Sequence, residues 1–302
     1  MIVIGLFTAL LAAFSWAVSA AFYKTGAKDV SALTSNLIRI LLPLLILSIV
    51  TLILNLYPFI TLLTFWEILF ILGSSLFAFV IGDALYFVTI QNIGVSRGVP
   101  VTSIYPFFIL LLQILFLAQP IHILMIPAVI ITIAGVAILG RQLNPDSKNQ
   151  VTLTRRQLSI GIIAGILTAL SWSISTLLLD TVLDTTNLFL IAVIRLLFAL
   201  TILIPIVLGQ QIVWKRDNLT QRQLLYLSIG GVFALVIGYI AFALSLQLVD
   251  ITSATVLSSL TPLFALIIGW RTLKERITWM TAVGVMACVI GIIFIAIAVS
   301  LV

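Results

Sequence analysis

The chain has 302 residues, of which 63% are hydrophobic and only 8% are charged, and its formal net charge is +6. Water-soluble globular proteins carry about 25% charged residues, so this composition excludes a soluble globule and predicts an integral membrane protein in contact with a lipid bilayer. No basic patch is interleaved with polar surface, so nucleic acid is not expected as a partner. The single cysteine, Cys288, lies in an apolar run, which excludes a disulfide framework and a cysteine metal site.

Ten apolar segments are long enough for the roughly 20 residues that a bilayer span requires. The first of them lacks the basic start of a secretory signal peptide and is expected to be retained. A backbone inside hydrocarbon must satisfy its own hydrogen bonds, and the runs are longer than barrel strands, so every span is predicted to be helical. The spans are residues 2–23, 31–54, 67–91, 98–118 and 121–140 in the first half, and 158–179, 187–209, 224–247, 252–270 and 277–300 in the second.

The two halves of the chain repeat each other. Phe77–Phe108 returns 156 residues later, without a gap, as Phe233–Phe264. The same offset pairs Arg39 with Arg195. A long fixed period indicates a duplicated unit. We therefore predict a first repeat over residues 1–140, a polar connector over 141–157 and a second repeat over 158–302.

Basic residues alternate from loop to loop. Thirteen of the fifteen Lys and Arg residues fall in loops that follow odd-numbered spans, and the loops after even-numbered spans hold none. Under the positive-inside rule the basic loops lie in the cytoplasm, which places both termini outside the cell membrane. Because each repeat has five spans, the second must enter the bilayer in the opposite direction. The predicted fold is an all-α integral membrane protein with ten transmembrane helices in two inverted five-helix repeats, a topology typical of secondary transporters.

Three charged residues lie deep inside predicted spans. Arg39 is about eight residues into the second span, Arg195 is equally far into the seventh, and Asp83 is a deep carboxylate in the third. An arginine in hydrocarbon is costly. Each one therefore either lines a water-filled cavity, or extends its charged end toward the membrane surface or bonds a free carbonyl of a broken helix, and the sequence leaves these readings open. Asp83 lies within a turn of the depth of Arg39. This predicts an Arg39–Asp83 ion pair, in which each charge offsets the desolvation of the other.

The position equivalent to Asp83 in the second repeat is Tyr239, so Arg195 has no matching carboxylate. Its planar guanidinium is suited to bind a carboxylate or a phosphate group of a substrate. The alternative is that Arg195 bonds backbone or hydroxyl groups, such as that of Tyr239, and never meets substrate.

Aromatic and hydroxyl side chains add further candidates for a cavity. Trp16 and Trp172 lie in the middle of the first and sixth spans, away from the interfaces where Trp is usually enriched, and they follow Ser15 and Ser171. The two tryptophans either line a cavity and stack on a ligand, or simply pack against small neighbouring residues. Tyr86 supplies hydrogen-bonding capacity in the third span.

Two prolines occupy equivalent positions in the fourth and ninth spans. Pro106 and Pro262 interrupt these spans and free backbone carbonyls that must face protein or water. They are candidates for kinks that take part in gating, with plain helix curvature as the alternative.

Jointly, these features resemble the EamA-like branch of the drug/metabolite transporter superfamily over essentially the whole chain. The resemblance implies alternating access around a central cavity, with the first four spans of each repeat forming its wall and small metabolites as substrates. It also implies that spans 5 and 10 are peripheral and lie at an oligomer contact, so a homodimer is expected. The residues that carry the resemblance are the Ser-Trp pairs, the arginines and the prolines named above, with Glu275-Arg276-Ile277-Thr278, Gly284 and Gly291.

We predict a secondary transporter of small metabolites such as amino acids, working in the direction of export. One alternative is an exchanger for phosphorylated anions, which would also use Arg195, and another is a membrane scaffold that transports nothing. An enzyme is not expected, because the sequence has no His/Asp/Glu cluster and no Gly-rich phosphate loop, and its one histidine, His122, lies at a membrane edge. For the same reason no metal and no cofactor is expected.

Overall fold

A computed structural model of the chain describes residues 1–117, 124, 127–128, 130–131, 134–135, 138, 153–213, 219–272 and 278–300. These residues form helices and connecting turns, and no strand occurs among them. Eight of their helical runs are long and apolar enough to cross a membrane. The all-helical membrane fold predicted from the sequence is therefore confirmed.

The first four predicted spans are present, two as single helices and two built from shorter pieces. The single helices are α1 (Ile2–Gly26) and α2 (Ala32–Ile53), and a 3-10 turn over Tyr57–Leu62 follows α2. The third span consists of α3 (Phe65–Ser75), a π-helical segment (Leu76–Gly82) and α4 (Asp83–Ile93). The fourth consists of α5 (Val95–Thr102) and α6 (Tyr105–Leu117).

The second half repeats this division. Its single helices are α8 (Arg155–Leu183), α9 (Leu188–Val213) and the final helix α14 (Trp279–Ser300). Between them lie α10 (Gln221–Gly231), a π-helical segment (Val232–Gly238) and α11 (Tyr239–Leu248), then α12 (Ile251–Ser258) and α13 (Thr261–Thr272). The two π-helical segments fall at the same point of the repeated sequence. Hydropathy did not predict them, and such segments are frequent at functional sites.

The predicted span boundaries agree with the helices to within about four residues. Capping residues explain several of the helix starts. Thr64, Thr154 and Thr220 each accept the backbone N–H of the residue three positions on, whose Glu or Gln side chain bonds back to the Thr N–H. Most of the predicted fifth span, 121–140, and most of the connector lie outside the described residues, so the described part accounts for nine of the ten predicted spans.

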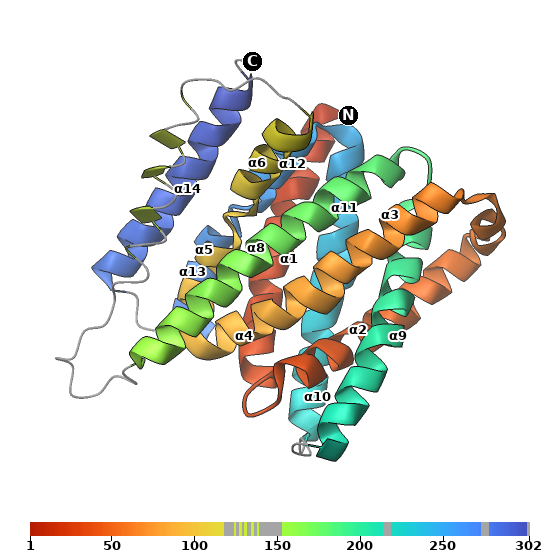
Figure 1. Cartoon of the computed structure of the whole chain (residues 1–302), viewed down its shortest axis with the longest axis horizontal. Coiled ribbons are helices and arrows are strands. Elements are labelled where there is room, and N and C mark those ends of the chain that lie inside the picture. The colour runs from red at the N-terminus through yellow and green to blue at the C-terminus, as the bar shows by residue number, and fades with distance from the viewer. Residues whose placement is uncertain are drawn as a thin grey trace.

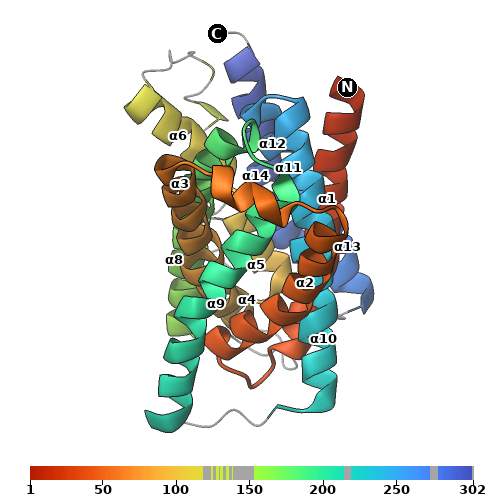
Figure 2. The same cartoon turned by 90° about the vertical axis from the view of Figure 1, so that its right-hand side faces the viewer.

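The two repeats run through the molecule in opposite directions. Contacts at the two ends of the span from Gln221 to Leu248 show the opposite directions. Near its start the Gln223 side chain donates to the Lys28 carbonyl in the turn after α1, and near its end the Gln247 side chain donates to the Leu183 carbonyl at the end of α8. A helix of 28 residues is about 42 Å long, so the two turns lie at opposite ends. Figure 1 shows α1 and α8 beginning at opposite ends, and in Figure 2 α1 begins and α14 ends at the same end.

The first helix of each repeat packs mainly against the other repeat. Helix α1 lies along α10, α11, α12 and α13, and α8 lies along α3, α4, α5 and α6. Glycines allow this approach: a Cβ on Gly5 would lie 2.8 Å from a methyl carbon of Val249, and one on Gly161 would lie 2.4 Å from a methyl carbon of Ile93. Small residues let membrane helices come close together. The repeats are therefore interlocked, and residues of both meet along the centre of the bundle.

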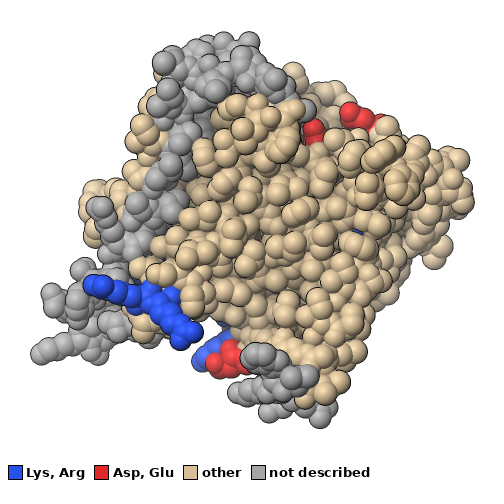
Figure 3. Space-filling view, viewed as in Figure 1, with Lys and Arg blue, Asp and Glu red and all other residues tan. Residues whose placement is uncertain are grey.

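The outside of the bundle is apolar between its two ends. Leu45, Phe116 and Ile163 are more than half exposed, as expected for side chains that face lipid instead of water. On the face shown in Figure 3, Lys and Arg atoms gather at the end where α8 begins, and the surface between the two ends is almost free of charge.

Candidate functional site

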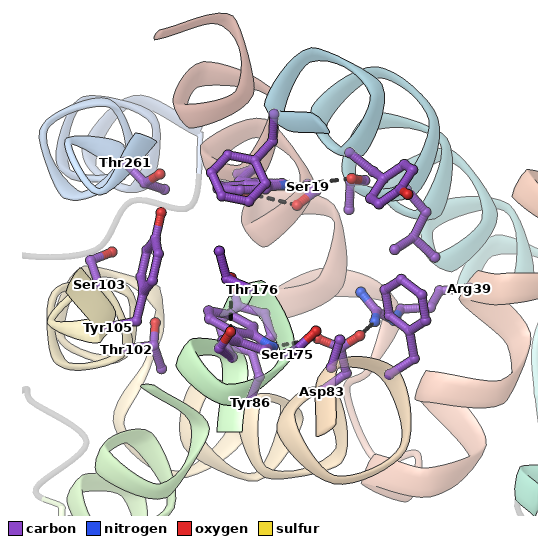
Figure 4. A pocket seen from close by; sticks show the side chains of 18 of the residues that line it. Ser19, Arg39, Asp83, Tyr86, Thr102, Ser103, Tyr105, Ser175, Thr176 and Thr261 are labelled. Carbon is purple, nitrogen blue, oxygen red and sulfur yellow. Dashed lines mark hydrogen bonds and ion pairs between the residues drawn. The ribbon is translucent and has the colours of Figure 1, made fainter. Parts of the chain in front are cut away.

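A cavity lies at the centre of the bundle, where the repeats meet. It has about 130 Å³ accessible to the centre of a water molecule, and residues from the first four spans of each repeat line it. The walls are largely aromatic and aliphatic. Hydroxyl groups of Thr102, Ser103 and Thr261 lie on one side, and Arg39 and Asp83 lie on the other (Figure 4). The cavity therefore has a charged side and a hydroxyl side.

Arg39 and Asp83 form the predicted ion pair. The Arg39 Nη2 group contacts Asp83 Oδ2, and both side chains are less than 10% exposed. The other guanidinium nitrogens are also bonded, since Nε donates to Asn36 Oδ1 at 3.0 Å and Nη1 donates to the Tyr23 hydroxyl at 3.1 Å. Asn36 is held in turn, because its amide donates to the Phe79 carbonyl at 2.6 Å. Every nitrogen of the Arg39 guanidinium thus has a protein partner.

The second oxygen of Asp83 is bonded by the other repeat. Trp172 Nε1, on α8, donates to Asp83 Oδ1 at 3.2 Å. The indole can come this close because Asp83 follows Gly82, where an added Cβ would lie 2.7 Å from Trp172 Cδ1. Asp83 therefore joins α2, α4 and α8, and its carboxylate accepts charge-assisted hydrogen bonds from both repeats.

The second repeat has an equivalent tryptophan–glycine contact, but it has no carboxylate beside it. Trp16 Nε1 donates to the Ala234 carbonyl of the second π-helical segment at 3.2 Å. Gly238 admits this indole as Gly82 admits the other, since a Cβ on Gly238 would lie 2.6 Å from Trp16 Nε1. Tyr239 stands where the first repeat has a carboxylate, so this tryptophan bonds the backbone instead of an acidic side chain.

Arg195 is buried without an acidic partner among the described residues. Its Nη2 group donates to the Ser175 hydroxyl at 3.0 Å and to the Ser74 carbonyl at 3.4 Å, and its guanidinium carbon lies 4.5 Å from the Phe79 ring centre and 5.3 Å from that of Tyr239. Its Nε group, and the Tyr239 hydroxyl, form no hydrogen bond within the described part of the chain. Arg195 therefore bonds a hydroxyl and a carbonyl, as the structural alternative predicted. Its Nε group also keeps unused hydrogen-bonding capacity, which binding of a substrate anion would require.

The opposite repeat also contacts the backbone of each arginine. Pro43 offers no N–H to the Arg39 carbonyl four residues earlier, and this oxygen lies against Gly231, where an added Cβ would be only 2.0 Å away. At the equivalent place the Ser75 hydroxyl donates to the Arg195 carbonyl at 2.5 Å. A glycine in one repeat and a serine in the other thus set the positions of the two arginines.

Two predicted cavity residues do not line the cavity. Ser15 is buried away from it, and the Ser171 hydroxyl donates to the Phe77 carbonyl in the first π-helical segment at 2.8 Å. Neighbouring residues of an α-helix point about 100° apart, so a serine beside a cavity-facing tryptophan faces a neighbouring helix. The predicted residues that do line the cavity are Trp16, Arg39, Asp83, Tyr86, Trp172, Arg195 and Tyr239.

The prolines do not kink continuous helices. The fourth and ninth spans break between α5 and α6 and between α12 and α13, and Pro106 and Pro262 are each the second residue of the helix that follows. A missing N–H costs little in a first turn. The interruption predicted for these spans is present, and the gating role stays a prediction.

Tyr105, the first residue of α6, connects the two broken spans. Its hydroxyl contacts the Ser258 hydroxyl at the end of α12 and donates to the Thr255 carbonyl at 3.1 Å. The backbone carbonyl of Tyr105 accepts from the Ser173 hydroxyl of α8 at 2.7 Å. Since Tyr105 also lines the cavity, relative movement of the repeats must change this contact.

The sequence pattern of the EamA-like transporter family matches residues 3–141 and again residues 159–297. The chain belongs to the EamA-like transporter family. The two EamA matches begin 156 residues apart, which is the period of the repeat found in the sequence. The resemblance to this branch of the drug/metabolite transporters is confirmed, and the chain is a multi-pass membrane transporter of the EamA type.

Two other proteins are similar to this EamA-like chain over nearly its whole length. An uncharacterized transporter from Archaeoglobus fulgidus is 28% identical over 294 residues, which cover 95% of each protein. A crystal structure matches the fold with a TM-score of 0.67 over 99% of this chain and 98% of that chain, at 15% identity. The second likeness concerns the fold alone.

Proposed function

We propose that this EamA-type transporter is a secondary transporter that exports small metabolites, amino acids among them, by alternating access to the central cavity. The observation that carries the proposal is the cavity, which both inverted repeats line and which contains Arg39, Asp83 and Arg195. Ionisable residues inside a membrane bundle are costly and usually mark a solute pathway. Inverted repeats that share a site near the middle of the membrane provide the symmetry that alternating access uses.

The two repeats offer matching contacts on which such a movement can act. Each repeat has a tryptophan on its first helix that contacts a glycine of the opposite repeat, and each has a broken span beside the cavity. If the repeats rock against each other, the tryptophan contact and the broken span of one repeat can adopt the geometry that the equivalent groups now have in the other repeat. The Tyr105 contacts with α12 are where we expect the broken spans to separate.

We place the basic end of the molecule in the cytoplasm of the cell, with both chain termini outside. The gathering of Lys and Arg at the end where α8 begins (Figure 3) supports this orientation under the positive-inside rule. The expected homodimer also stays a prediction. Helix α14 lies at the edge of the bundle (Figure 1), which suits it for an oligomer contact.

Exchange of phosphorylated anions is less well supported by the cavity. A phosphate monoester carries a charge of about −1.5 to −2 at neutral pH. Among the described lining residues only Arg195 is a cation without an ion pair. A dianion would therefore keep part of its charge uncompensated.

Flux measurements on purified protein in liposomes test the proposal. Liposomes loaded with an unlabelled amino acid or organic acid are expected to accumulate the labelled solute faster than protein-free liposomes, with a rate that saturates as its concentration rises. Phosphate counterflow is measured in parallel to test the exchanger. If correctly folded protein moves no solute of any of these classes, the transport proposal fails and the scaffold is favoured.

A further inference from the structure

The charge of the cavity lining points to the kind of solute that it binds. We propose that the substrate is a small organic anion with one negative charge, a monocarboxylate with an apolar body, whose carboxylate binds at Arg195 and Tyr239. The proposal rests on the proposed function, because it concerns the substrate of the same cavity.

The lining carries a single uncompensated charge. In the described part of the chain its ionised side chains are Arg39, Asp83 and Arg195. The first two neutralise each other in an ion pair, which leaves one positive charge on Arg195. A buried charge without a counter-charge is costly. A solute with one negative charge removes this cost, whereas a neutral solute does not and a dianion brings a second charge that also lacks a partner.

Two hydrogen-bonding groups of the cavity wall, on Arg195 and Tyr239, can donate to such an anion. The Arg195 Nε group and the Tyr239 hydroxyl are buried and make no well-aligned hydrogen bond to a described residue. The two side chains interact with each other, and both belong to the cavity wall. A carboxylate has two oxygens that accept such donors. Both groups are covered in the present conformation, so binding requires the two side chains to turn toward the cavity.

Several hydroxyl groups of the lining do not compete for this role. Those of Ser19, Thr176 and Thr261 donate to main-chain carbonyls within 3 Å. They therefore present oxygen lone pairs to the cavity, which do not attract an anion. Among the described lining residues Arg195 is the one cation without an ion pair, and the Tyr239 ring lies 5.3 Å from its guanidinium carbon, so a carboxylate finds its charged donor there.

A zwitterionic amino acid matches the lining less well than its des-amino acid. Its carboxylate would satisfy Arg195, but its ammonium group would find no unpaired carboxylate among the described lining residues, since the charge of Asp83 is already neutralised by Arg39 and its other oxygen accepts from Trp172. The remainder of the solute would meet apolar wall. This wall includes Trp16, Phe79, Leu179, Leu235 and Phe242.

Four solutes of similar shape test the proposal on the full-length protein. These are 3-phenylpropionate, its neutral amide, phenylalanine, and phenethyl phosphate. Ligand-induced thermal stabilisation in detergent gives their affinities, and liposome flux shows which of them are moved. We expect 3-phenylpropionate to bind at least tenfold more tightly than each of the other three. We also expect Arg195→Gln to weaken its binding at least tenfold, Arg195→Lys to weaken it less, and the exposed control Arg222→Gln to leave it unchanged.

The proposal is overturned if phenylalanine, the amide or the phosphate binds as tightly as 3-phenylpropionate, or if a folded Arg195→Gln protein binds it as the wild type does. Comparison of the four solutes needs no variant, so poor folding of Arg195→Gln leaves the test intact. In each of these outcomes, the transporter proposal still stands if the protein moves the preferred solute across the liposome membrane. Loss of flux for every class of solute is what would defeat that proposal.

Discussion

Replacing Asp83 with asparagine is expected to lower the free energy of unfolding by about 3–5 kcal/mol. The substitution preserves shape but leaves the Arg39 guanidinium charged and unpaired in a site where both side chains are less than 10% exposed. It also removes the negative charge that accepts the Trp172 indole N–H. Reversible unfolding in mixed micelles, followed by tryptophan fluorescence, measures the loss.

Two controls separate the missing counter-charge from general damage. The double variant Arg39→Met, Asp83→Leu removes both charges and is expected to recover most of the loss, because a buried ion pair is worth little more than well-packed apolar residues. Asp184→Asn changes an exposed carboxylate just after α8 and should stay within about 0.5 kcal/mol of the wild type. A loss below about 1 kcal/mol for Asp83→Asn would show that water, and not Asp83, compensates Arg39.

Replacing Gly231 with alanine is expected to destabilise the fold by about 1–3 kcal/mol, the usual cost of overpacking. The added Cβ would lie 2.0 Å from the Arg39 carbonyl oxygen, and backbone of α2 cannot rotate away as a side chain can. Helix α2 must shift, which displaces Arg39 from Asp83. Unfolding measurements give the stability, and solute binding shows whether the shift reaches the cavity.

Gly209→Ala is the matched control for this substitution. Gly209 also lies inside a helix, α9, but a Cβ there would meet nothing within 4 Å. Alanine has a higher helix propensity than glycine, by about 1 kcal/mol, so this variant should be as stable as the wild type or more stable. Equal effects of the two substitutions would contradict the packing of α10 against α2.

The sequence predicted the features that follow from a residue's position along the chain or from its depth in the membrane. A repeat with an odd number of spans, together with the alternation of basic loops, predicted inversion, and the turns near Lys28 and Leu183 do lie at opposite ends. Arg39 and Asp83 were paired because they share a depth. These inferences needed no knowledge of how each helix is rotated.

Features that depend on helix rotation were missed or misplaced. Ser15 and Ser171 were expected in the cavity because they adjoin tryptophans, but one step along a helix turns a side chain by about 100°. The repeat gives no signal for Tyr23 and Asn36, which bond Arg39, because the second repeat has Leu179 and Ala192 at their places. The three-residue spacing of Asn36 and Arg39, which puts both on one helix face, was a signal that could have found Asn36.

Labelling of introduced cysteines in oriented membrane vesicles tests the central claim, that an inverted pair of repeats exposes one cavity to each side in turn. In a Cys288→Ala background, cysteines at Lys28 and Asp184 define the two faces, and a cysteine at Thr176, which lines the cavity (Figure 4), reports access to the site. A membrane-impermeant maleimide is predicted to label Lys28→Cys from the cytoplasmic face alone, Asp184→Cys from the outer face alone, and Thr176→Cys from both. Labelling of the two turns from the same face, or of Thr176→Cys from one face or neither, would contradict the account.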